Sequence, residues 1–125
     1  MLMNSRTQAH YFHLQTTSYA KHKALQKYYE GIVDLLDAYA EAYMGKYDRV
    51  KPVKMNKTFL TDPEKAPAYF KNLLKRVKTV KRPKDSYLQN IEDEIITLIT
   101  KTLYLLPASV IGRQSGCTRP RVWRL

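Results

Sequence analysis

Cysteine is almost absent from this sequence of 125 residues, and the absence excludes two classes of small protein. Cys117 is the single cysteine, so no internal disulfide can form and a disulfide-stapled scaffold is excluded. One thiol and three histidines are also too few for a cysteine-rich zinc finger. The fold must depend on an apolar core, for which a single domain with 44% hydrophobic residues is sufficient.

Long apolar runs are lacking as well. The best of them, residues 95–106, is interrupted by Lys101 and falls short of the roughly 18 residues that a membrane-spanning helix needs. Residues 1–10 do not show the basic and then apolar layout of a secretion signal. We therefore expect a soluble cytoplasmic protein that does not engage a membrane.

Glycine and proline are scarce, at four and six residues, which favours helices. Four helices are predicted: residues 2–16, residues 18–45, a third that begins between 61 and 67 and ends before residue 83, and residues 85–106. Residues 46–60 are predicted to form a loop. In the second helix the apolar residues recur three or four apart, at Leu25, Tyr29, Ile32, Leu36, Tyr39 and Tyr43. Four amphipathic helices predict an all-α fold, an antiparallel four-helix bundle over residues 1–106 whose first helix is shortened.

Residues 107–125 differ in character from the rest of the chain. They contain no acidic residue, four arginines, and glycine and proline residues that break any helical period. We interpret this segment as a basic disordered tail or as an extension foreign to the natural protein.

The positive charge is concentrated in the middle of the chain. The net charge is +11, and residues 46–84 alone hold 13 basic and three acidic side chains. Such a surface can neutralise phosphates without reading a base sequence. The candidate nucleic-acid-binding residues are Lys71, Lys75, Arg76, Lys78, Lys81 and Arg82. An equally open interpretation is a solvated basic helix face with no partner.

Four carboxylates lie along the second predicted helix, at Glu30, Asp34, Asp37 and Glu41. Their spacing of four, three and four places them on one face of a helix that turns about 100° per residue. Polar residues opposite an apolar stripe usually face water. Like charges on successive turns destabilise a helix, however, unless a cation lies nearby. His10 and His13 on the first helix add imidazoles, and imidazole with carboxylate is a ligand set suited to iron.

The spacing of these residues resembles the ferroxidase signature of the DNA-protection-during-starvation (Dps) family, within the ferritin-like superfamily. His22 follows His10 by twelve residues, and Asp37 follows His22 by fifteen. Glu41 comes four residues later. The stretch AHYFHLQTTSYAKHKALQKYYEGIVDLLDAYAEAY is similar to the end of the family's first helix, its short loop and its second helix. The chain resembles in particular the small Dps-like proteins that tailed bacteriophages encode.

The resemblance implies a homodimer or larger homo-oligomer with iron bound at the dimer interface. In the family, two histidines come from one subunit and an acidic pair from its two-fold partner. The implied metal ligands are His10, His22, Asp37 and Glu41, and the implied reaction is oxidation of Fe(II) by peroxide or oxygen. The family's nonspecific association with DNA would suit the basic surface, and a phage origin would place the protein in the cytoplasm of a bacterial host.

Two positions depart from the family's pattern. Gln26 stands where the family usually has an acidic ligand, and Tyr11 stands where it usually has a tryptophan. Because the glutamine removes a charged ligand, an alternative stays open: a non-catalytic phage helical bundle that binds nucleic acid or a host partner through its basic surface.

Overall fold

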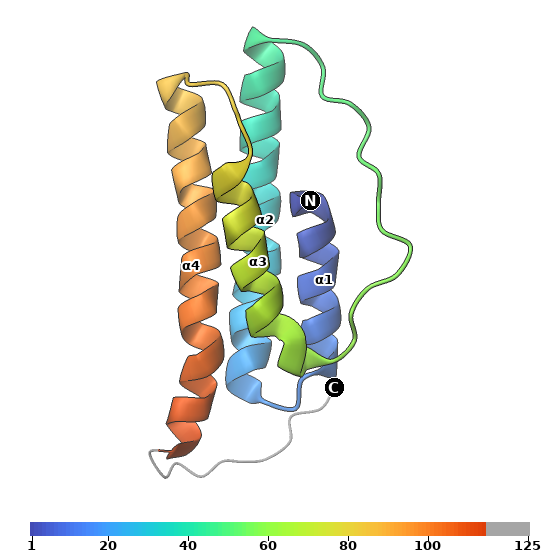
Figure 1. Cartoon of the computed structure of the whole chain (residues 1–125), viewed down its shortest axis with the longest axis vertical. Helices are drawn as coiled ribbons and strands as arrows, with labels where there is room; N and C mark the ends of the chain where they lie inside the picture. Colours follow the sequence, from blue (N-terminus) through green and yellow to red (C-terminus); the bar gives the residue numbers. More distant parts are fainter. Residues whose placement is uncertain (115–125) are drawn as a thin grey trace.

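The computed structural model describes the backbone of residues 1–114 and the side chains of residues 1–106. Its elements are α1 Leu2–Gln15, α2 Tyr19–Lys46, the 3-10 turn η1 Pro63–Lys65, α3 Ala66–Thr79 and α4 Ser86–Gln114 (Figure 1). No strand occurs within the described residues. The predicted all-α four-helix bundle is therefore confirmed.

The helix pairs with the most extensive contact all run antiparallel (Figure 1). The extensive pairings are α1 with α2, α2 with α4, and α3 with α4. The chain leaves the end of α2, returns along the outside of the bundle through residues 47–62, and enters α3 in the same direction as α2 (Figure 1). We call residues 47–62 the crossover. With 14 residues, α1 and α3 are about half as long as α2 and α4, which have 28 and 29.

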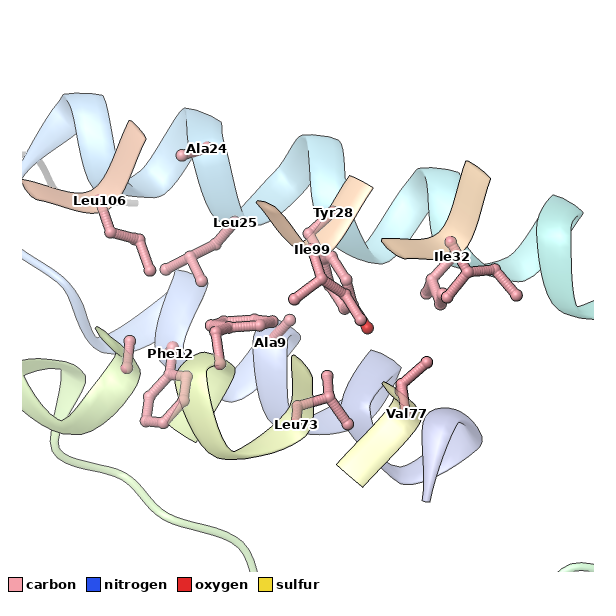
Figure 2. Close-up of a cluster of buried hydrophobic side chains, with 13 residues drawn as sticks. Ala9, Phe12, Ala24, Leu25, Tyr28, Ile32, Leu73, Val77, Ile99 and Leu106 are labelled. Atoms are coloured by element: carbon pink, nitrogen blue, oxygen red, sulfur yellow. The ribbon is translucent and has the colours of Figure 1, made fainter. Parts of the chain in front are cut away.

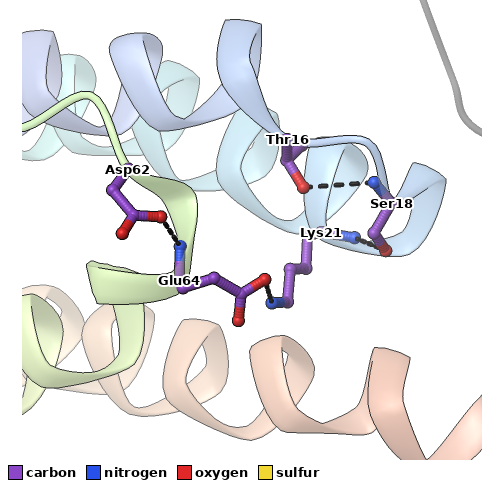
Figure 3. Close-up of polar contacts among 5 residues, drawn as sticks. All are labelled: Thr16, Ser18, Lys21, Asp62 and Glu64. Atoms are coloured by element: carbon purple, nitrogen blue, oxygen red, sulfur yellow. Dashed lines mark hydrogen bonds and ion pairs between the residues drawn. The ribbon is translucent and has the colours of Figure 1, made fainter.

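Local sequence signals explain where the helices begin. The Ser18 hydroxyl accepts a hydrogen bond from the Lys21 amide and caps α2, and the Thr16 hydroxyl accepts one from the Ser18 amide. Asp62 accepts a bond from the Glu64 amide at the start of η1. The Lys21 ammonium lies 3.8 Å from the Glu64 carboxylate, so these two helix starts lie side by side (Figure 3). The 3-10 turn takes up the first predicted turn of the third helix, and α3 itself begins at Ala66.

The core lies between the two long helices and the two short ones. Phe12 of α1, Leu25 of α2 and Ile99 of α4 are fully buried and belong to one cluster of buried side chains (Figure 2). Tyr28 is also fully buried, and its hydroxyl lies 2.7 Å from that of Ser5 on α1. The predicted stripe instead contained Tyr29, which is half-buried at the edge of the core. The two tyrosines are adjacent on α2, and it is Tyr28 that faces the short helices.

The crossover is attached to α1 by two side-chain amides. Asn4 donates to the carbonyl of Lys54 and accepts from the amide of Asn56, at 3.3 and 2.8 Å. One helical turn later, Gln8 donates to and accepts from the backbone of Leu60, both at 2.8 Å. Because each carboxamide satisfies a backbone donor and a backbone acceptor, the crossover has a defined path without helical or strand structure.

The fourth helix passes the boundary expected at residue 106 and ends at Gln114. A proline removes one amide donor from a helix and often kinks or breaks it, but Pro107 does not end α4. The rest of the predicted tail, residues 115–125, lies outside the described residues. None of the helices, as far as the structure describes them, has the length and apolar character to cross a membrane.

Candidate metal site and basic surface

Two histidines join the end of α1 to the start of α2. The Nδ1 atom of His13 lies 2.8 Å from the carbonyl oxygen of His22, and the Nδ1 atom of His22 lies 3.0 Å from the carbonyl oxygen of His13. The two rings stack with their centroids 3.5 Å apart. Both residues are buried, at 6% and 5% exposure. This reciprocal pair fixes the position of both rings.

The hydrogen bonds also fix which ring nitrogen carries the proton. A carbonyl oxygen only accepts, so Nδ1 must be the protonated nitrogen in each neutral ring, and the lone pair lies on Nε2. Burial lowers the pKa of His13. The hydrogen bond to the His22 carbonyl opposes this shift, and the charges of His22 and His10 add to it. Neutral imidazole is the form that binds metal ions, and a hydrogen bond from the other ring nitrogen to a carbonyl is common for metal ligands.

His10 lies on the exposed side of α1, one turn before His13. Its ring stacks on Tyr29 of α2, with centroids 4.6 Å apart, and lies 5.9 Å from the ring of His13. Burial, followed by the charge of Glu30, raises the pKa of the Tyr29 phenol. The structure thus groups His10, His13 and His22 in a row at the α1–α2 contact, with His13 between the other two.

The carboxylates of the acidic stripe are all exposed on α2, at Glu30, Asp34, Asp37 and Glu41. Gln26 donates a hydrogen bond to Glu30 at 3.3 Å. Fifteen residues separate His22 from Asp37, and at 1.5 Å per residue this is about 22 Å along the helix. No group of three histidine, cysteine or acidic side chains within the described part of the chain could hold a metal ion. One copy therefore brings the histidines together but keeps Asp37 and Glu41 away from them.

Five of the six predicted nucleic-acid-binding residues are exposed on or just after α3, namely Lys71, Lys75, Arg76, Lys78 and Lys81. The sixth, Arg82, is half-buried. It donates to the carbonyl of Val77 at 2.8 Å and lies 3.6 Å from the carboxylate of Glu92. Arg82 therefore stabilises the end of α3, and its charge is partly balanced.

Sequence reasoning placed His13 beside His10 and did not single out Tyr29 as part of a site. The spacing of three residues between His10 and His13 correctly puts both on one side of α1. The sequence predicts the short turn between the first two helices, but the stacking and hydrogen bonding of His13 with His22 across that turn are seen only in the folded structure. Tyr29 carried a usable signal, because it belongs to the apolar stripe and lies next to Glu30.

Comparison with known proteins gives one family. The model of a family of unknown function (DUF5856) matches residues 13–106, which include α2, α3 and most of the described α4. No curated protein and no solved structure matches the chain significantly.

Proposed function

We propose that this chain, which belongs to the DUF5856 family, is a Dps-like protein that binds and oxidises Fe(II) at a site shared by two copies. The observation that carries the proposal is the hydrogen bonding of the buried histidines, which fixes their tautomer and orientation. His22 is held in the tautomer that presents Nε2, by a hydrogen bond from Nδ1 to the His13 carbonyl. A carbonyl that accepts from the far nitrogen in this way orients an imidazole for a metal and increases its basicity.

The separation of histidines and carboxylates supports a shared site. Two α2 helices that cross antiparallel about a two-fold axis near Tyr29 and Glu30 would bring His22 of one copy level with Asp37 of the other. Isologous contacts of this kind are the commonest in homo-oligomers. The same contact would place a row of imidazoles against the exposed acidic stripe, and an iron ion bound between them would supply a cation beside the carboxylates.

The connectivity of the bundle also supports a ferritin-like protein. A four-helix bundle with a single long crossover is the ferritin-like arrangement. Here the crossover is residues 47–62, and its path along α1 is held by Asn4 and Gln8. Phe59 of the crossover stacks on Tyr11, with ring centroids 5.3 Å apart. Tyr11 therefore performs a packing role at the position where the Dps family usually has tryptophan.

The residues divide the work between binding and charge balance. Fe(II) is the substrate, and each ion gives one electron to peroxide or dioxygen as it becomes Fe(III). Asp37 and Glu41 supply anionic oxygens that stabilise the added positive charge, and the imidazoles supply neutral nitrogens. Gln26 contributes no charge, so the site has one carboxylate fewer than the family's usual set. We therefore expect weaker Fe(II) binding than in a site with that carboxylate. We place the protein in the bacterial cytoplasm.

Substitution of one exposed carboxylate tests the proposal. Asp37→Asn removes a ligand charge without touching the core, and we expect it to weaken Fe(II) binding by more than about tenfold, the effect that even the outer residues of metal sites have when they are replaced. The measurement is anaerobic Fe(II) titration by calorimetry, followed by oxidation with peroxide. Asp34→Asn is the matched control, because it removes one charge from the same stripe at a position that matches no ligand. Equal Fe(II) affinity in the two variants would refute the site.

A second candidate function is nonspecific association with nucleic acid through α3. Lys71, Lys75 and Lys78 are exposed at spacings of four and three, so their ammonium groups share one face. The structure gives none of them an ion pair within residues 1–106. Three unpaired cations in a row on a short helix can follow a phosphate backbone.

Salt dependence tests this second function. The triple variant Lys71→Ala, Lys75→Ala and Lys78→Ala should lower the slope of log affinity against log salt concentration by about three, one for each phosphate that is no longer neutralised. The measurement is fluorescence anisotropy with duplex DNA of mixed sequence. Lys23→Ala, Lys27→Ala and Lys101→Ala together form a control of the same net charge. If the slope decreases equally in both triple variants, binding depends on total charge and α3 is not the binding surface.

A further inference from the structure

Tyr29 lies between two histidines of the candidate site. Its ring stacks on His10, with centroids 4.6 Å apart and planes 28° from parallel. The same ring meets His13 edge-on, at 5.2 Å and 80°. Tyr29 is half-buried on α2, where it packs against the core cluster. One side chain of α2 therefore contacts both histidines of α1.

These contacts restrict the rotation of the exposed His10 ring. His13 cannot rotate freely, because its Nδ1 is bonded to the His22 carbonyl and its ring is stacked on His22. The edge contact with His13 fixes the plane of Tyr29, and the face of Tyr29 then covers one face of His10. An exposed histidine on a helix otherwise samples several rotamers, and ordering it on binding would oppose affinity.

We propose that Tyr29 is a positioning residue, whose ring holds the His10 imidazole in one orientation before iron arrives. The inference rests on the proposed function, since it assigns His10 a ligand role. Tyr29 acts through the face of its ring and not through its hydroxyl, so phenylalanine should replace it. Ligands that are already oriented bind a metal more tightly than ligands that must first be ordered.

The test compares Tyr29→Phe, Tyr29→Leu and wild-type protein, with Tyr43→Leu as the control. Tyr43 is a half-buried tyrosine of the same helix whose ring contacts Tyr47, remote from the histidines. The first readout is the NMR signal of the His10 ring in metal-free protein, because a stacked aromatic ring shifts it. Tyr29→Leu should move this signal toward that of free histidine, whereas Tyr29→Phe and Tyr43→Leu should leave it in place.

The second readout is Co(II) binding, followed by its visible absorption. We expect about tenfold weaker binding for Tyr29→Leu, within the range for residues that orient a ligand, and a changed absorption band because His10 is no longer fixed. Tyr29→Phe should keep the Co(II) affinity and the absorption band of the wild-type protein. An unchanged His10 signal and unchanged Co(II) affinity in Tyr29→Leu would overturn the inference. A wild-type protein that binds no Co(II) would overturn the proposed function, while the metal-free His10 signal would still decide whether Tyr29 holds that ring.

Discussion

Two inactive variants should recover iron oxidation when they are assembled together. The first, His10→Ala with His22→Asn, lacks the imidazole ligands but keeps its carboxylates. The second, Asp37→Asn with Glu41→Gln, lacks the carboxylates but keeps its imidazoles. If each site takes histidines from one copy and carboxylates from the other, either variant alone should oxidise Fe(II) at the rate of the protein-free blank.

A mixed dimer of the two variants contains one complete site and one site that lacks every ligand. Random pairing of equal amounts makes half of the dimers mixed, so about a quarter of the wild-type sites should be intact. The variants are unfolded together in urea, refolded, and assayed by the appearance of ferric absorbance after peroxide is added. His22→Asn is chosen because the asparagine amide can still donate to the His13 carbonyl, which preserves the link between α1 and α2.

The control for this experiment replaces the histidine-free partner with a chain that carries all four substitutions. That mixture contains no complete site, so its rate should stay at the blank. Two different affinity tags, one on each variant, show whether mixed dimers have formed. Recovery would identify a shared site directly. Mixed dimers without recovery would show that the histidines and carboxylates do not act together.

The sequence predicts the helices of this protein well because its local signals agree with one another. The serine before α2 and the apolar spacing within that helix both place its start near Tyr19. The path of the crossover is harder to predict from the sequence. It depends on Asn4 and Gln8, whose partners lie about 50 residues further along the chain and are backbone groups without a sequence signature. Loop residues attached by side-chain amides carry no periodic pattern.

The core position on α2 illustrates a second limit. Tyr28 and Tyr29 both fit a spacing of three or four from Leu25 and Ile32, so periodicity cannot choose between them. The choice depends on the angle at which α1 and α3 approach, since Tyr28 meets Ser5 and Phe70 from those helices. For the candidate site, prediction from the sequence of one chain meets a more fundamental limit. The sequence contains every residue of the proposed site, but one copy holds Asp37 about 22 Å along α2 from His22, so the proposed site requires a second copy.

Replacing Phe70 with alanine should lower the free energy of unfolding by about 3–5 kcal/mol, the range for truncation of a buried aromatic residue. Phe70 is fully buried on α3, and its ring meets Tyr28 edge-on at 4.8 Å and Tyr69 at 5.3 Å. Truncation would remove both aromatic contacts and leave a cavity between α2 and α3. The measurement is urea unfolding followed by circular dichroism, at one protein concentration because association shifts apparent stability.

The effect should be large because α3 is held by few residues. Its buried side chains are Ala66, Phe70, Leu73 and Val77, and Phe70 is the largest of them. Without it, α3 should detach at lower urea than the long pair of α2 and α4, and the lysines on its outer face should lose their common orientation. Tyr104→Ala is the control, since Tyr104 is 74% exposed and its truncation should change stability by no more than about 0.5 kcal/mol. A similar small change for Phe70→Ala would mean that the two long helices, and not the aromatic contact between α2 and α3, supply the stability of the bundle.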